Sequence, residues 1–415
     1  MPPDPRPVQP STVLALSRTL RAGSAGAAAV AAASLTAAAR GALPDGRSGH
    51  PVIAGAGACS INASVVTNRS TTMKQQQYVG LDVSLEQTSI CVVDDAGATI
   101  WRGKCRSTPE SIHTVIAKHA PEAVRIGLES GQLSTWLFHE LKARRLPVIC
   151  IDARHAKAAL SLQINKTDAN DAHGIAQIVR VGWYREVAVK SMDSHAIRAV
   201  LVARAQLVTQ KVKLTNCIRG LLKTFGIVLG GGKGRRFEAM VRERIAENPM
   251  LTTIIEPMLV VLLTTREQLA VFERLVRRRA RADHDVRRLM TVPGVGAVIA
   301  LAYTTTIEDP ARFKRSSSVA AYLGLTPRRY QSGEMDRAGH ISRCGDAMLR
   351  TYLYEAANVM LRRSTRPSQL SLWGRALSER IGARKALVAV ARKLAVVLHS
   401  MWRERMEFRF EQAAA

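Results

Sequence analysis

The stretch Tyr78-Val-Gly-Leu-Asp-Val83 is the first of three short apolar segments that decide the fold. The other two run from Thr88 to Val93 and from Ala98 to Lys104, and the turn residues Asp94-Asp-Ala-Gly97 separate them. Short runs rich in apolar and β-branched residues, bounded by turn formers, predict β-strands. Because the connections are short, we expect these strands to form an antiparallel meander.

Helices and strands alternate after this meander. The pattern predicts a helix at 109–119, a strand at 124–129, a helix at 133–144 and a strand at 148–152. A meander followed by such alternation predicts an α/β sheet. The first and fourth strands are expected to be neighbours in it.

Acidic residues occur at notable places in this plan. Asp82 lies inside the first strand and Glu129 at the end of the fourth. Asp168 and Asp171 lie in Asn165-Lys-Thr-Asp-Ala-Asn-Asp171, which reads as the start of a helix. Residues three apart on a helix share a face, so all four carboxylates are expected to converge at one end of the sheet.

A carboxylate cluster of this kind suits Mg²⁺ or Mn²⁺, and two such ions about 4 Å apart can activate a nucleophile and stabilise a leaving oxygen. Each acid also has a structural interpretation. Asp82 could end a strand, Glu129 could cap the following helix, and Asp168 and Asp171 could serve a helix N-terminus. An acid inside an apolar strand is costly without a partner, which favours the metal site.

The chain is strongly basic. It has 415 residues, 60 Lys and Arg against 33 Asp and Glu, and a formal charge of +27. Such an excess indicates a polyanionic partner, above all nucleic acid. A membrane surface is the competing interpretation, but no apolar run reaches the roughly 20 residues of a spanning helix. Six scattered cysteines without C-x-x-C spacing favour a reducing, cytoplasmic setting.

Residues 1–73 are rich in Ala, Ser, Gly and Pro, and we expect a disordered extension. Met73 is an alternative translation start.

The segment 195–225 predicts one long helix, with apolar residues every seven positions at Val200, Leu207, Leu214 and Leu221. A glycine-rich turn at 226–234 precedes a second helical stretch, expected to break near Pro249 and Pro257. The two helices predict an antiparallel hairpin or an intermolecular coiled coil, with ordinary helix packing equally compatible.

The sequence Val292-Pro-Gly-Val-Gly296, flanked by helical patterns, is typical of the turn of a helix-hairpin-helix. In such a turn Gly294 and Gly296 would let backbone N–H groups approach a phosphate. The rest of the C-terminal region, including 349–406, is expected to be mainly helical.

Ser332 is followed by a glycine and surrounded in sequence by arginines. A serine among guanidinium groups can attack a phosphodiester, because the cations offset the developing charge. On spacing alone, a turn serine beside phosphate-binding arginines is favoured. The candidate nucleic-acid-binding arginines are Arg328, Arg329, Arg337, Arg343 and Arg350.

Two sets of motifs together resemble one family. The first set is Gly80-Leu-Asp-Val83, Leu128-Glu-Ser-Gly131 and Lys166-Thr-Asp-Ala-Asn-Asp171. The second set comprises Pro293-Gly-Val-Gly296, Leu323-Gly-Leu-Thr-Pro327, Gln331-Ser-Gly333 and Gly339-His-Ile-Ser-Arg-Cys-Gly345. Over residues 74–405 the chain resembles the IS110 family of insertion-sequence transposases, relatives of the Piv DNA invertase.

This resemblance implies an RNase H-like (RuvC-like) DEDD domain at 74–190, a helical coiled-coil linker at 191–283 and a transposase domain at 284–407, followed by a tail at 408–415. It places the metal-binding tetrad on Asp82, Glu129, Asp168 and Asp171, and the nucleophile on Ser332. It also implies a phosphoserine link to DNA, a non-coding guide RNA, and a homo-oligomer (dimer or tetramer) whose centres combine residues of two subunits. The setting would be the bacterial cytoplasm, at the nucleoid.

The first hypothesis is therefore a DNA recombinase of an insertion sequence. The alternative is a metal-dependent, RuvC-like nuclease of the junction-resolvase type, in which water attacks and Ser332 is structural. A third possibility is an inactive element protein that only binds nucleic acid.

Overall fold

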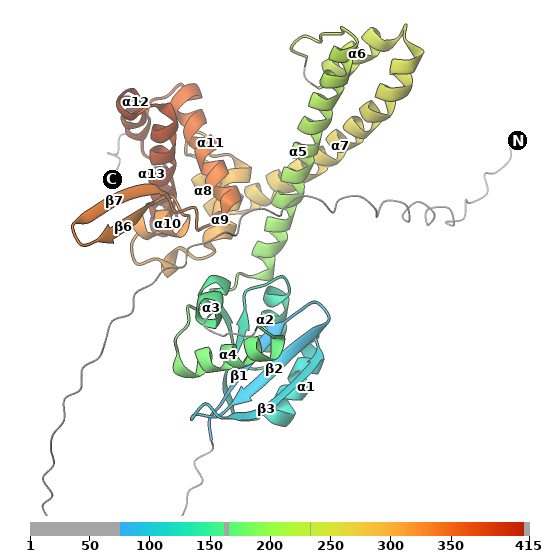
Figure 1. Cartoon of the computed structure of the whole chain (residues 1–415). Coiled ribbons are helices and arrows are strands. Elements are labelled where there is room, and N and C mark those ends of the chain that lie inside the picture. The colour runs from blue at the N-terminus through green and yellow to red at the C-terminus, as the bar shows by residue number, and fades with distance from the viewer. Residues whose placement is uncertain (1–74, 162–165, 233, 411–415) are drawn as a thin grey trace, which may run out of the picture. The chain divides into compact units, whose positions relative to one another are not determined.

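A computed structural model describes residues 75–161, 166–232 and 234–410 (Figure 1). The expected extension at 1–73, with the alternative start at Met73, lies outside the described residues, as does most of the expected tail.

In the described part of the chain, five strands form one mixed sheet in the order β3-β2-β1-β4-β5. β1, β2 and β3 pair antiparallel, whereas β1, β4 and β5 pair parallel. The predicted meander and the predicted neighbourhood of the first and fourth strands are confirmed. The strands are β1 Gln77–Val83, β2 Gln87–Val93, β3 Thr99–Arg106, β4 Ala123–Glu129 and β5 Val148–Ile151.

Helices cover both faces of this sheet. On one face α1 (Pro109–His119) and α2 (Ser134–Ala143) share a core with Val79 and Leu81 of β1. On the other face α4 (Asp168–Val181) packs against β1, β2 and β4. Because side chains alternate along a strand, the residues between and beyond Val79 and Leu81 face α4.

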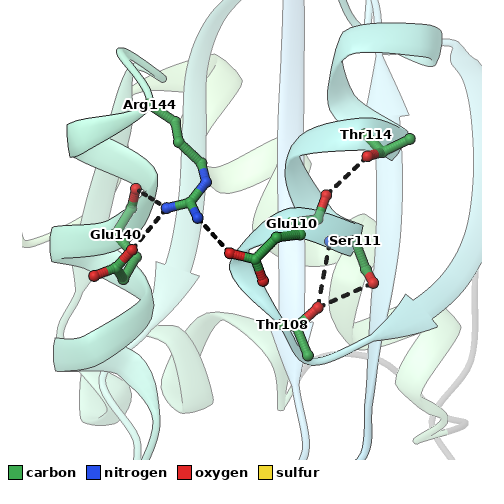
Figure 2. Close-up of polar contacts among 6 residues, drawn as sticks. All are labelled: Thr108, Glu110, Ser111, Thr114, Glu140 and Arg144. Atoms are coloured by element: carbon green, nitrogen blue, oxygen red, sulfur yellow. Dashed lines mark hydrogen bonds and ion pairs between the residues drawn. The ribbon is translucent and has the colours of Figure 1, made fainter.

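Arg144 joins α1 to α2 (Figure 2). Its guanidinium donates to the Glu140 carboxylate at 2.7 Å and to the Glu140 carbonyl at 2.9 Å, and it also pairs with Glu110. α1 begins where the hydroxyl of Thr108 accepts a hydrogen bond from the backbone N–H of Ser111. This bridge fixes the helical layer opposite α4.

A helical hairpin follows the sheet. α5 (Met192–Thr224) and α7 (Pro249–Ala282) pack together, with α6 (Arg235–Ile245) between them in sequence. Asp193, at the start of α5, pairs with Arg279, near the end of α7, so the two helices run antiparallel. The chain therefore forms the intramolecular hairpin that was one of the two expected arrangements.

The residues of the seven-residue apolar pattern are not the buried residues along the whole of α5. Leu221 is 36% exposed and Phe225 is 45% exposed, while Ile218 and Leu222 are buried against α6 and α7. A straight α-helix drifts by about 20° per heptad, so the buried stripe moves off a strict seven-residue repeat.

The expected break at Pro257 is also wrong. α7 begins at Pro249, as the sequence indicates, but it continues through Pro257. Ile255 and Leu259 on either side are buried in the core with α5 and α6. Their burial offsets the hydrogen bond that proline removes.

The C-terminal region packs helices around Tyr303, whose hydroxyl donates to the carbonyl of Ala395 at 2.7 Å. It also contains a hairpin of β6 (Pro327–Ser332) and β7 (Met335–Ile341), which the expectation of a mainly helical region did not include. The helices are α8 His284–Leu289, α9 Ala297–Ile307, α10 Ser317–Tyr322, α11 Ala347–Arg363, α12 Gln369–Ile381 and α13 Ala383–Glu404. Among the described residues, no helix combines the length and apolarity needed to cross a bilayer.

Candidate functional site

Two glycines bring α4 directly onto the sheet. Gly80 of β1 and Gly127 of β4 lie opposite each other in the parallel ladder. A Cβ on Gly80 would lie 2.0 Å from the carbonyl oxygen of Ala172 in α4, and one on Gly127 would lie 2.5 Å from a methyl group of Val179. Only glycine permits so close an approach at Gly80, since the neighbour is backbone.

Asp82 and Glu129 each follow one of these glycines by two positions. They therefore face the same side of the sheet, toward α4. α4 begins with Thr167 as its N-cap, whose hydroxyl accepts from the N–H of Asn170 at 3.2 Å, and its first turn carries Asp168 and Asp171. This packing puts the four acids on the same side of the sheet.

The carboxylates interact electrostatically. Burial, followed by repulsion from Asp171 and Asp168, raises the pKa of Asp82. Burial, followed by repulsion from Asp82 and Asp171, raises the pKa of Glu129. Asp82 and Glu129 are thus partly buried carboxyls whose charges repel those of neighbouring acids more than nearby lysines offset them, which favours a bound cation.

A lysine that was not singled out in the sequence lies at the edge of this cluster. The ammonium of Lys104 on β3 donates to Oδ2 of Asp168 at 2.9 Å and lowers the pKa of that carboxyl. Among the described residues, no three His, Cys, Asp or Glu side chains are arranged closely enough to hold a metal ion. In this arrangement the four acids share a face of the sheet, while Asp168 is paired with lysine.

Ser332 lies elsewhere in the chain, at the end of β6, where it pairs across the ladder with Met335. It is exposed, and Gly333 after it has φ +55°, which turns the chain into β7. A hollow of about 550 Å³ is lined by Arg329, Tyr330, Gln331, Ser332, Met335 and Arg337. The serine hydroxyl is therefore accessible, and two of the predicted arginines line the same hollow.

The five arginines have different surroundings. Arg329 pairs with Asp336 at 2.6 Å, and Arg328 donates to the carbonyl of Ser342 at 3.2 Å. Arg350 donates to the carbonyls of Leu323 and Gly345, so it braces the base of the hairpin. The side chains of the other two, Arg337 and Arg343, are exposed and make no hydrogen bond or ion pair with described residues.

The loops before and after the hairpin press together at its base. Gly324 has φ +68°, and a Cβ there would lie 2.5 Å from the backbone nitrogen of Cys344. A Cβ on Gly345 would lie 2.2 Å from the carbonyl oxygen of Tyr322. These glycines therefore fix how the hairpin carrying Ser332 leaves the helical core.

The glycines of the 292–296 turn also differ. Gly294 has φ +87°, and a Cβ on it would lie 2.4 Å from the carbonyl oxygen of Ala356 in α11. Gly296 precedes α9 as its N-cap and faces open space. Gly294 thus serves helix packing, and Gly296 is the one with room for a ligand nearby.

Sequence reasoning singled out the acids and Ser332 as candidates but overlooked Lys104 and the close approach at Gly80. The sequence did contain a signal for the close approach at Gly80. Gly80-Leu-Asp82 and Gly127-Leu-Glu129 repeat the order glycine, leucine, acid on two strands.

Two family models match the chain. One, described as a transposase and named for a DEDD domain, matches residues 79–227, which include the acids. The other, described as the transposase IS116/IS110/IS902 family, matches residues 286–372, which include the hairpin.

Curated relatives agree. The chain is 29% identical over 343 residues to the transposase for insertion sequence element IS1111A of Coxiella burnetii, a match covering 81% of this chain and 93% of that protein. It is 30% identical over 243 residues to a probable family 20 transposase of Pseudomonas aeruginosa, covering 57% and 72%. It is also 30% identical over 240 residues to the transposase for element IS1328 of Yersinia enterocolitica, covering 56% and 70%.

Both family models and the three relatives named above are described as transposases, one of them as a probable one. The chain belongs to the IS116/IS110/IS902 family of transposases. Membership implies an enzyme that cleaves and rejoins DNA, and the DEDD domain indicates a requirement for divalent metal. The resemblance inferred from the motifs is thereby confirmed.

Proposed function

We propose that this transposase cuts and rejoins DNA through a phosphoserine formed at Ser332, assisted by a metal site at Asp82, Glu129, Asp168 and Asp171. The observation that carries the proposal is the paired glycine–leucine–acid order on β1 and β4, because it seats α4 and brings the four carboxylates to one face. The strand order and the antiparallel β1-β2-β3 meander support an RNase H-like fold for this region.

In the proposed cleavage, Oγ of Ser332 attacks the scissile phosphorus and gives up its proton to solvent. A phosphorus–Oγ bond forms, the bond to the 3′ oxygen breaks, and that oxygen leaves with the bonding electrons and takes up a proton from solvent to become a 3′ hydroxyl, so that no net proton is released. Rejoining reverses these events, with the 3′ hydroxyl of another strand attacking the phosphoserine. The side chains of Arg329 and Arg337, which line the hollow beside Ser332, offset the negative charge that develops on the phosphate.

In chemistry, though not in the spacing of the described structure, the carboxylates suit a divalent cation such as Mg²⁺ or Mn²⁺, because they supply hard oxygen ligands, and burial together with mutual repulsion raises the pKa of Asp82 and Glu129. When bound, the metal would supply Lewis acidity at the phosphate. Glu129 and Asp82 are held by strands and Asp171 by the first turn of α4, so their positions are set before substrate arrives.

Several finer features belong to the same proposal. The regions 74–190, 191–283 and 284–407 would act as carboxylate domain, helical linker and serine-bearing domain, with a helix-hairpin-helix turn at 292–296. A net charge of +27 suits DNA together with a guide RNA. Exposed apolar residues on α5 and α7, such as Val212, Val260 and Val261, suit a homo-oligomer. The enzyme would act on bacterial DNA at the nucleoid.

A covalent-adduct assay tests the chemistry. The full chain would be mixed with Mg²⁺, labelled DNA spanning an element junction and RNA transcribed from the flanking region, then run on a denaturing gel. We expect a protein-linked DNA band that disappears in Ser332→Ala and in Asp82→Asn. Ser318→Ala, an exposed serine on α10, is the matched control and should keep the band.

Cleavage without any adduct, unchanged in Ser332→Ala and lost in Asp82→Asn, would refute the phosphoserine. That result would indicate the hydrolytic nuclease, with water as nucleophile. An adduct that survives Asp82→Asn would instead refute the assignment of the metal site.

A further inference from the structure

Lys104 lies in one row with the acidic cluster. In the antiparallel ladders Asp82 of β1 is opposite Ser89 of β2, and Ser89 is opposite Lys104 of β3. Directly opposite residues point to the same face, so Lys104 faces the side covered by α4. Its ammonium reaches Oδ2 of Asp168 at 2.9 Å, although the two residues lie 64 positions apart in the sequence.

The contact is easily broken. The side chain of Lys104 is 49% exposed and that of Asp168 is 64% exposed. Ion pairs in water contribute little to folding, because solvent screens them and the side chains lose freedom. The Lys104–Asp168 ion pair therefore contributes little to the stability of the fold, and breaking it costs little.

The pair also conflicts with metal binding. Asp168 is the member of the cluster whose oxygen a lysine of the protein contacts, and the positive charges of Lys166 and, to a smaller extent, Lys104 also act on Asp82. A divalent cation that takes Oδ2 of Asp168 as a ligand must displace the ammonium. Lysine carries a compact charge on a flexible stem, so the displaced ammonium remains at the edge of the site.

We propose that Lys104 is a positioning residue that holds Asp168 until divalent metal binds and then transfers to a phosphate of the DNA backbone. The inference rests on the proposed metal site. It makes metal binding and DNA binding cooperative, because the cation frees the lysine that the phosphate uses. Lysine is well suited to the second partner, since it binds phosphate as a point charge.

The first experiment measures Mn²⁺ affinity of the full chain without DNA, by electron paramagnetic resonance of the free ion. Lys104→Met removes the lysine that competes for Oδ2 of Asp168, and we expect Mn²⁺ to bind about 1.4-fold to fivefold more tightly, the range of a surface ion pair. Lys104→Arg should stay near wild type. Arg106→Met is the matched control. Arg106 is exposed and lies two residues from Lys104 on the same face of β3, but it is opposite Gln87 of β2, whereas Lys104 is opposite Ser89.

The second experiment measures the salt dependence of DNA binding in a Ser332→Ala background, which prevents the proposed covalent step. With Mg²⁺ present, Lys104→Met should make DNA binding less salt-dependent. The magnitude of the slope of log affinity against log salt concentration should fall by about 0.9, the value for one phosphate contact. With a chelator instead, the slope should not change. An equal change under both conditions would refute the transfer of Lys104 from Asp168 to phosphate.

Asp82→Asn separates this inference from the proposed function. If Asp82→Asn weakens Mn²⁺ binding while Lys104→Met and Arg106→Met behave alike, the metal site stands and the role of Lys104 is wrong. If Asp82→Asn leaves Mn²⁺ binding unchanged, the metal site itself is wrong.

Discussion

Replacing Gly80 by alanine tests the contact on which the carboxylate cluster depends. The new Cβ would lie 2.0 Å from the carbonyl oxygen of Ala172, whereas ordinary contacts begin at 3.4 Å, so α4 must move away by about 1.4 Å. Overpacking a filled core costs about 1–3 kcal/mol. Since the obstructing atoms are helix backbone and cannot rotate aside, we expect about 3 kcal/mol.

The movement also displaces Asp168 and Asp171 relative to Asp82. Misplacement of reacting groups by about 1 Å costs about 100-fold in rate, and we expect strand exchange to fall by at least this factor. Urea unfolding followed by circular dichroism would report stability, and hydrogen exchange of α4 would show whether this helix is the part that loosens. The adduct assay would report activity.

Gly220→Ala is the control. Gly220 lies inside α5, and a Cβ there meets nothing within 4 Å. Alanine is the better helix former by about 1 kcal/mol, so this variant should be slightly more stable and fully active. If Gly80→Ala had wild-type stability, α4 exchange and activity, the close approach of α4 to β1 would not exist as described.

Two further predictions concern the acid cluster and the C-terminal turn. Because burial raises the pKa of Asp82 in the folded chain, its contribution to stability is full below the ordinary carboxyl pKa and is lost as pH rises through the folded value. Metal-free Asp82→Asn should therefore be more stable than wild type at pH 7.5, and the difference in stability should shrink toward pH 4. The midpoints of urea unfolding in EDTA measure this difference. A difference that grows on acidification would contradict the prediction. Gly294→Ala should lose about 2–4 kcal/mol, because it combines φ +87° with contact to the α11 backbone, whereas Gly296→Ala should stay within about 0.5 kcal/mol. Thermal unfolding compares these two, and equal losses would refute the distinction.

The sheet was predictable because its strands are apolar and bounded by turn residues. β2 is almost entirely buried, and β1 and β4 have buried centres, so their composition reflects their position. β6 was not predictable on these grounds, because all its side chains are exposed and no period-two pattern arises. The helix break expected at Pro257 does not occur, because the burial of its neighbours Ile255 and Leu259 outweighs the local cost of a proline inside a helix.

Asp82 and Glu129 were recognisable because a carboxylate inside an apolar strand is energetically costly unless it has a partner. Lys104 gave no such signal, since a lysine on an exposed edge strand is ordinary and its partner is far away in sequence. Arg350 has a structural role that its sequence context does not reveal. Its place among arginines indicates phosphate binding, yet it donates to two backbone carbonyls, which only the folded loops reveal.

The order of the two halves in the chain has a consequence during synthesis. The mixed sheet and α4 are complete at Val181, and Ser332 follows 151 residues later (332 − 181). At about 5–20 residues per second, roughly eight to thirty seconds separate them on the ribosome. The nascent protein therefore carries its full set of acids well before it carries the proposed nucleophile. Of the two groups in the proposed reaction, the acids are therefore synthesised and can fold first, and the chain can join strands only after the serine-bearing hairpin has followed them.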